Sequence, residues 1–186
     1  MNKSEDAADQ DSQGNQTDLA TISALIAHLN CENVIECQKA RRCLVSMGRE
    51  AVGPLIEALA SRKPWVRWEA AKALGQIGDP AAVQALVKAL TDKRFDVRWL
   101  AAEGLITLGP DGVIPLLHAL IESADSLWLR QGAHHVFHDL SSLDLREILQ
   151  PLLAALEDIE PSLVVPFAAK KALDVLTQAE GEYADE

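Results

Sequence analysis

Three histidines stand close together in the second half of the chain, and histidine is the side chain that most often binds metals. His134 and His138 are four positions apart, so their imidazoles share one face of a helix, and His135 and His138 form a second pair. A zinc or iron site needs a third ligand, and none can be named. We therefore assign no metal site and keep His134 and His138 as weak candidates. Lining a groove or making a pH-sensitive contact is the favoured role.

The cysteines form a second set of reactive side chains. Cys31, Cys37 and Cys43 are six residues apart, which on a helix rotates each by about 240° from the last. They cannot share a face or hold a metal together. An odd number of unpaired thiols is typical of a reducing cytosol. We expect small core or surface residues in a cytoplasmic protein.

An arginine recurs once in each of three similar segments. Val66-Arg67-Trp68 returns as Val97-Arg98-Trp99, and Leu129-Arg130-Gln131 is a weaker third copy. Three guanidinium groups in a column could bind an acidic partner. Recurring acids in the turns, Asp79, Asp96 and Asp111, favour instead a structural ladder that ties one unit's turn to the next, because a residue repeated with the fold usually maintains it.

The segments that carry these residues are repeated helix pairs. Val66–Leu74 returns after 31 residues as Val97–Leu105 and after a further 32 as Leu129–Phe137. Small or apolar residues recur in them at i, i+4, i+7, i+8 and i+11, which predicts a helix with one buried face. Two further copies of the block begin at Ala40 and Ala169, and a second apolar helix is expected before each. No segment alternates with period two, so no strands are expected.

Glycines mark the ends of the predicted second helices. Gly48, Gly78 and Gly109 follow their last apolar positions, where a left-handed residue is wanted, and Gly104 with the alanines allows close helix approach. One helix pair cannot bury its face alone, so the units must stack. We predict an all-α fold, an α-solenoid (superhelix) of about five helix-turn-helix repeats. The predicted units are roughly 18–48, 49–78, 79–109, 110–140 and 141–177, between a disordered acidic tail, 1–17, and an acidic C-terminal tail, 178–186.

At this point a family resemblance is specific. Val-Arg-Trp-x-Ala-Ala-x-x-Leu followed by Gly-Asp-Pro-Ala-Ala-Val-x-x-Leu resembles the HEAT-like repeat of the phycobilisome-lyase type over roughly residues 18–177. In the last unit Val165-Pro166-Phe167 replaces Val-Arg-Trp. The resemblance implies a curved, right-handed array whose second helices line the concave side.

Trp68 and Trp99 are the strongest candidates for binding a partner. Both lie two positions from buried residues, so they point away from the core and onto the concave wall. Exposed tryptophan beside arginine is typical of interaction hot spots, although the indoles could simply lie flat on alanine-rich neighbours. Trp65 and Trp128 are expected to staple helix starts. The predicted groove consists of Trp68, Trp99, Arg67, Arg98, Lys72, Glu103, Arg130, Gln131, His134, His138 and Phe167.

Charge is unevenly distributed along the chain, whose net charge is −11. Residues 38–98 hold twelve basic and six acidic side chains, whereas residues 99–177 hold four basic and eleven acidic ones. A general nucleic-acid binder is usually basic overall, so this composition argues against one. No export signal stands at the start, and no apolar run approaches the roughly 18 residues of a membrane span, so no membrane partner is expected.

These observations favour a non-catalytic scaffold or adaptor that binds a partner protein or peptide on its concave surface. No phosphate loop, nucleophile elbow, metalloprotease helix or Cys-x-x-Cys motif is present, so we assign no catalytic residue and no cofactor and leave enzymatic activity open. The alternative implied by the resemblance is a bilin lyase or isomerase subunit that acts on a phycobiliprotein, with a tetrapyrrole near Arg67 or Arg98. A nucleic-acid enzyme of the HEAT fold is a weaker third reading.

Overall fold

The computed structural model describes residues 19–30, 33–141 and 145–184, with only the backbone for 179–184. Within these residues every regular element is a helix, which confirms the all-α prediction. The helix Leu19–His28 precedes α2 (Val34–Met47). The elements that follow are α3 (Arg49–Ala58), α4 (Pro64–Ile77), η1 (Pro80–Ala82), α5 (Val83–Ala89), α6 (Phe95–Leu108), η2 (Gly109–Gly112), α7 (Val113–Ser123), α8 (Leu127–Leu140), α9 (Arg146–Leu156) and α10 (Pro161–Ala184).

Three helices, α2, α4 and α6, end at the glycines that the sequence predicted. Gly48, Gly78 and Gly109 have φ values of 62°, 68° and 65°, and each lies directly after α2, α4 or α6. A side chain is strained at such φ values, so glycine is the residue that lets the chain leave the helix there. Asn33 and Ser126 accept hydrogen bonds from backbone amides at the starts of α2 and α8. Local sequence thus sets these helix ends.

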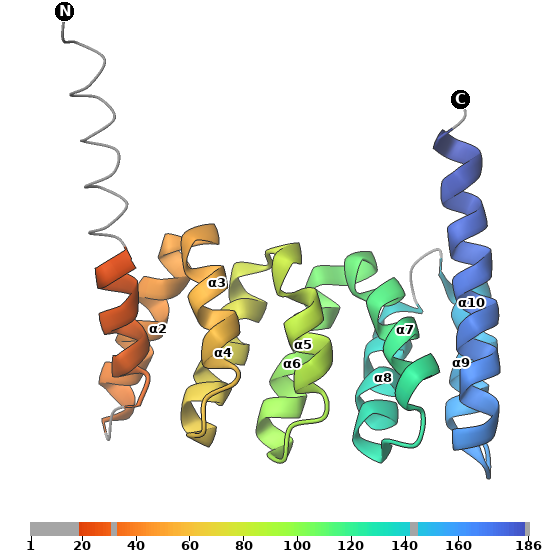
Figure 1. The fold of residues 1–186 in the computed structure, drawn as a ribbon, viewed down its shortest axis with the longest axis horizontal. Coiled ribbons are helices and arrows are strands. Elements are labelled where there is room, and N and C mark those ends of the chain that lie inside the picture. The colour runs from red at the N-terminus through yellow and green to blue at the C-terminus, as the bar shows by residue number, and fades with distance from the viewer. Residues whose placement is uncertain (1–18, 31–32, 142–144, 185–186) are drawn as a thin grey trace, which may run out of the picture.

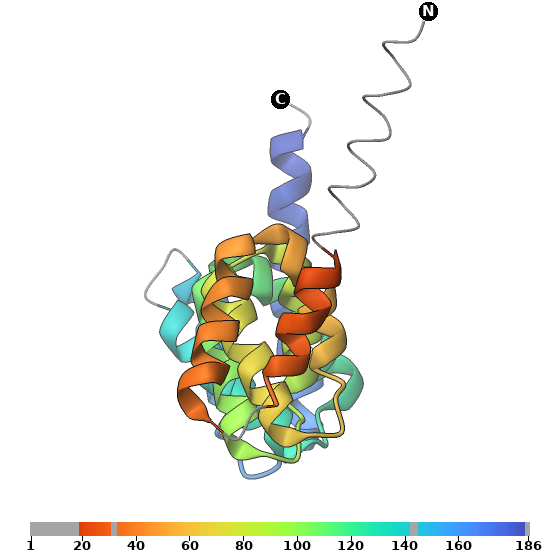
Figure 2. The ribbon, with the colours of Figure 1, turned by 90° about the vertical axis from the view of Figure 1, so that its left-hand side faces the viewer.

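The helix pairs stack side by side in chain order (Figure 1) and lie behind one another when the molecule is viewed from its N-terminal end (Figure 2). The second helices α2, α4, α6 and α8 form one row, and we call their outer side the second-helix face. Packing is tightest between α4 and α6, where a Cβ at Gly75 would lie 3.0 Å from the Cα of Gly104. The predicted close approach at Gly104 is confirmed. The predicted apolar positions of α4, α6 and α8 are buried or half-buried in the core.

The last helix pair departs from the row. α10 packs against α7 and α9 rather than beside α8, and α9 instead contacts α8 (Figure 1). The last two helices have therefore exchanged places relative to the pairs before them. Phe167, predicted to extend the tryptophan column, lies on α10 and is 79% exposed, so it does not belong to the row formed by α4, α6 and α8. α10 also includes residues 178–184, which the sequence assigned to the C-terminal tail.

An ion pair that sequence reasoning overlooked is buried between α2 and α4. Arg41 and Glu69 are 6% and 1% exposed, and Arg41 Nη1 donates to Glu69 Oε2 at 3.0 Å. Burial raises the pKa of Glu69, although Arg41 and Lys72 act in the opposite direction. The position equivalent to Glu69 in the next unit is Leu100, so the pair is a feature of this junction rather than of the repeat.

The cysteines only partly meet expectation. Cys37 is buried and disulfide-bonded, so the prediction of unpaired thiols is wrong there, whereas Cys43 is exposed and free. Cys31 lies outside the described residues. A disulfide removes the cysteine argument for a reducing compartment.

Among the described residues, the apolar stretch Phe95–Ser123 is long enough by length and composition to cross a membrane. It was not predicted from the sequence. The stretch consists of α6, η2 and α7, and Gly109 interrupts it with a positive φ of 65°. Of its most apolar window, 44% is buried inside the protein. Core helices of an α-solenoid have this composition because one face of each is covered by its neighbours.

Candidate functional site

The recurring arginines bond to the turns of the repeat, and Arg67 makes the predicted tie to an acid of the next turn. Arg67 Nη1 donates to the carbonyl of Ser61 at 2.9 Å, and Arg98 Nη1 donates to the carbonyl of Asp92 at 2.8 Å. Arg130 Nη1 makes the same bond to the carbonyl of Ala124. In each case the acceptor lies six residues earlier, in the turn between the two helices of a pair. The repeated arginine therefore holds its own turn.

Arg67 also ties its turn to the next one. Its Nε and Nη2 donate to the two carboxylate oxygens of Asp92 at 2.6 and 2.9 Å. Burial opposes ionisation of Asp92, but hydrogen bonds from Arg67 and from the Arg94 amide outweigh it and lower the pKa of this carboxyl group. The sequence predicted the ladder but named the wrong acids. Asp79 and Asp96 face Arg49 and Arg94 instead.

The ladder changes at the following junction. Ser61, Asp92 and Ala124 occupy equivalent turn positions, because each offers its carbonyl to the arginine six residues later. Arg67 pairs with the carboxylate at this position of the next turn, whereas for Arg98 the equivalent position of the next turn is Ala124. Arg98 has no ion pair among the described residues. Its guanidinium carbon lies 4.7 Å from the centre of the Trp128 ring and 5.7 Å from that of Phe95.

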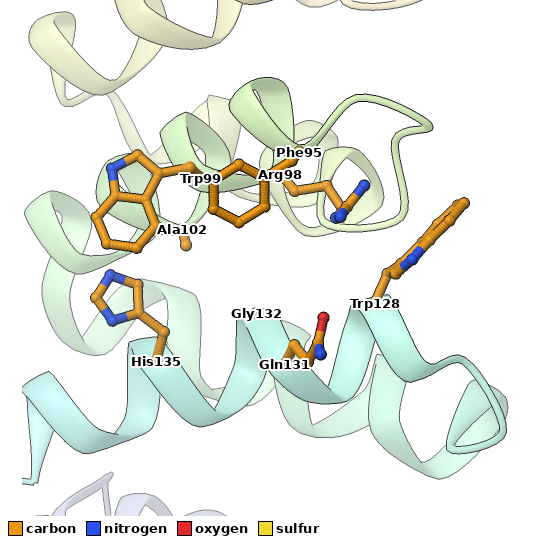
Figure 3. A pocket seen from close by; sticks show the side chains of 8 residues that line it. All are labelled: Phe95, Arg98, Trp99, Ala102, Trp128, Gln131, Gly132 and His135. Carbon is orange, nitrogen blue, oxygen red and sulfur yellow. The ribbon is translucent and has the colours of Figure 1, made fainter.

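A cavity of about 230 Å³ opens between α6 and α8 on the second-helix face (Figure 3). Most of its wall is apolar, and four of its lining residues come from each helix. Phe95, Trp99 and Trp128 remain 68%, 47% and 40% exposed around it. The residues that line it are Phe95, Arg98, Trp99, Ala102, Trp128, Gln131, Gly132 and His135; we call this the α6–α8 cavity.

Contacts within the α6–α8 cavity hold its aromatic wall in place. The Trp99 and His135 rings are stacked, with centroids 4.7 Å apart and planes 20° apart (Figure 3). His135 Nε2 lies 2.9 Å from Glu103 Oε1, so a carboxylate from α6 orients the imidazole from α8. Gly132 leaves space for Leu90, because a Cβ there would lie 2.8 Å from Leu90 Cδ2. Stacking and hydrogen bonding together preorganise the cavity.

Trp68, the other predicted anchor, lies outside this cavity. Its ring stacks on Trp65, with centroids 4.8 Å apart and planes 9° apart, and Lys72 Nζ lies 4.8 Å from the ring centre. Trp65 therefore packs on a neighbouring indole, and Trp128 lies under Arg98. The prediction that Trp65 and Trp128 serve as staples missed both contacts. Lys72 and Glu103 also line a shallow hollow between α4 and α6.

The candidate metal residues line a separate, more polar cavity between α8 and α9. His134 and His138 have ring centroids 6.2 Å apart, and His134 Nε2 lies 2.9 Å from Glu157 Oε1. Arg146 and Gln150 complete the polar wall of this cavity, whose volume is about 480 Å³. In the described part of the chain, no three His, Cys, Asp or Glu side chains are arranged to hold a metal. The predicted pair thus gains a carboxylate neighbour without forming a ligand set.

Comparison with known proteins identifies the repeat. Residues 22–106 match the family of HEAT repeats. The helix pairs of this segment are therefore HEAT-like repeats. A solved structure described as the complex of CpcE and CpcF of phycocyanin lyase from Nostoc sp. PCC7120 matches it with a TM-score of 0.57 and 26% identity, over 83% of this chain and 98% of that chain. These matches confirm the predicted resemblance to HEAT-like repeats of the phycobilisome-lyase type. No curated protein matches the sequence.

The structure brings together only some of the predicted groove residues. Arg98, Trp99 and Gln131 line the α6–α8 cavity, and Glu103 supports it through His135. Arg67 and Arg130 belong to the ladder, and Phe167 is elsewhere. Phe95 and Trp128 were missed as cavity residues. The available signal was their position at the first turns of α6 and α8, directly after the turns that Arg98 and Arg130 hold.

Proposed function

We propose that this HEAT-repeat protein is a recognition scaffold that binds a partner protein through the α6–α8 cavity. One observation carries the proposal: three exposed aromatic rings and an arginine that forms no ion pair with a described residue converge on one preorganised cavity. Tryptophan and arginine in a pocket that a partner can desolvate are the usual composition of a binding hot spot. Elsewhere on the second-helix face, the Trp65 and Trp68 rings stack on each other, and Trp65 is 39% exposed.

The size of the cavity supports a protein side chain as its occupant. Pockets for small molecules and cofactors are usually about 300–1,000 Å³. The α6–α8 cavity, at about 230 Å³, falls below that range. One large side chain of a partner would fill it, while flanking segments of the partner would cover the rims. Most of the binding free energy would then come from burying Trp99 and Trp128.

Affinity capture with paired tryptophan variants tests the proposal. Trp99→Ala with Trp128→Ala removes the cavity wall, and Trp65→Ala with Trp68→Ala removes the same number of indoles from α4. We expect wild-type protein and the α4 variant to retain a specific partner from native cell extract and the cavity variant to lose it, with helix content unchanged by circular dichroism. Retention of the partner by a folded cavity variant would refute the proposal.

A second candidate function comes from the match to the phycocyanin lyase complex. Under this reading the chain is a subunit that acts on a phycobiliprotein, and a tetrapyrrole ring stacks on Trp99 with a propionate near Arg98. Only part of such a pigment would fit inside about 230 Å³, so its other rings would lie along the open face. Transfer of a linear tetrapyrrole to an apo-phycobiliprotein subunit, followed by visible absorption, tests it. If the apo-phycobiliprotein subunit stays colourless after incubation with the tetrapyrrole and this protein, the lyase reading is excluded.

A further inference from the structure

The chemistry around Arg98 indicates what kind of partner segment the cavity accepts; this inference rests on the proposed function. Arg67 donates to its own turn and then to both oxygens of Asp92. Arg98 donates to its own turn in the same way, but the position that should supply the carboxylate is Ala124. Its Nε and Nη2 groups make no hydrogen bond to any described residue. The repeat therefore contains a ladder position from which the acid is missing.

The guanidinium of Arg98, which lacks this acid, lies at the cavity. Arg98 lines the α6–α8 cavity, and the aromatic rings of Trp128 and Phe95 lie on its guanidinium. Planar guanidinium groups bind carboxylates through two parallel hydrogen bonds, as Arg67 does with Asp92. Apolar surroundings strengthen such a bond. A carboxylate brought by a partner would thus take the place that Asp92 takes at the preceding junction.

Charge nearby favours the same ligand. Arg62, Lys63 and Lys93 lie in the turns before α4 and α6, are exposed, and make no ion pair within the described residues. Arg62, Lys93 and Arg94 line one open hollow at this end of α4 and α6. Residues 99–177, which include α8 and α9, hold four basic and eleven acidic side chains. An acidic segment is therefore attracted toward the α4–α6 side and repelled from the α8–α9 side.

We propose that the α6–α8 cavity binds an acidic segment of a partner protein, in which an aromatic side chain enters the cavity and a neighbouring Asp or Glu pairs with Arg98. The aromatic side chain packs on Trp99 and Trp128, and the carboxylate replaces the ladder acid absent at Ala124. Burial of the rings supplies affinity, and Arg98 supplies selectivity for the acid.

The sharpest test restores the missing acid. In Ala124→Asp the new carboxylate stands one unit after Asp92, at the equivalent position, and pairs with Arg98. An external carboxylate then has no free guanidinium to bind. The probe is acetyl-Asp-Phe-Asp-amide, compared with acetyl-Asn-Phe-Asn-amide, and the readout is the shift of the Trp99 and Trp128 indole NMR signals during titration. Arg42→Gln, which makes the same change in net charge on the exposed side of α2, is the control.

We expect the acidic peptide to bind wild type and Arg42→Gln at least about fivefold more tightly than the amide peptide, and Ala124→Asp to remove this preference. Arg98→Gln gives the same test without a buried substitution, in case Ala124→Asp does not fold. Equal binding of the two peptides, or no saturable shift with either, overturns the inference. If binding is equal and still depends on Trp99, the scaffold proposal stands while the acidic partner does not.

Discussion

At the scale of single residues, one turn position decides what a repeated arginine does. Arg67 and Arg98 occupy equivalent places and hold their own turns through equivalent bonds. Asp92 engages the first in a structural ion pair, whereas Ala124 leaves the second available to the α6–α8 cavity. Structure and recognition thus use the same residue type, and the neighbouring turn separates the two roles.

The structural role predicts a pH-dependent loss of stability in Asp92→Asn. The folded-state pKa of Asp92 is lowered, so its stabilisation is complete above its unfolded pKa of about 3.9 and disappears as pH falls through the folded value. We expect urea unfolding at pH 7 to show a loss of about 1–3 kcal/mol, with a smaller difference from wild type below about pH 4. Asp96→Asn, which breaks an exposed pair, should cost less than about 1 kcal/mol. Equal losses for both variants would contradict the ladder.

Sequence alone identified the arginines of the ladder but not their acids. Repetition marks Arg67, Arg98 and Arg130 as equivalent, and repetition can be read directly from the sequence. Which carboxylate an arginine reaches depends on how neighbouring repeat units pack in three dimensions. The spacing of residues along the sequence does not give this packing. Asp79 and Asp96 looked suitable because they also lie in turns, yet the carboxylate that accepts hydrogen bonds from Arg67 is that of Asp92.

At the scale of helices, close contact between α4 and α6 depends on two glycines. A Cβ at Gly75 would lie 3.0 Å from the backbone of Gly104, and backbone cannot move aside as a flexible side chain can. Trp99 of the α6–α8 cavity lies on α6, one of the two helices in this contact. The spacing of the second helices is therefore part of the architecture of the site.

This contact predicts opposite effects for two glycine-to-alanine changes. Gly75→Ala should destabilise the protein by about 1 kcal/mol or more, because overpacking outweighs the gain in helix propensity. Gly53→Ala, in α3, has nothing within 4 Å of the new Cβ and should stabilise by about 0.5–1 kcal/mol. Chemical denaturation of both variants measures the difference. A stabilising Gly75→Ala would show that α4 and α6 separate at little cost.

Helices, turns and glycine ends were predictable because each follows from local periodicity and conformational preference. The exchange of α9 and α10 was not, because the block Ala169–Leu173 resembles the other second helices while its packing partner is α7. Phe167 was consequently placed in the wrong column. Likewise, Trp128 lines the cavity because of how α6 and α8 pack against each other. The sequence of one helix does not predict that packing.

At the scale of the whole molecule, the α6–α8 cavity lies where the net charge along the chain changes from positive to negative. Residues 38–98 are basic in balance and residues 99–177 acidic, and Arg98 is the last basic residue of the first group. A partner with the opposite asymmetry would be oriented before contact, since charge complementarity governs encounter and register more than affinity. The stacked units supply a rigid support for this surface.

Site-specific photocrosslinking tests the central claim most directly. A photoreactive amino acid at Gln131 lies at the α6–α8 cavity, and one at Gln84 lies in a different hollow, between α3 and α5. Both glutamines are exposed, so neither change disturbs the core. We predict that irradiation with native cell extract links one protein species to position 131 and not to position 84. Crosslinks that form only at position 84, or equally at both positions, would contradict recognition through the α6–α8 cavity.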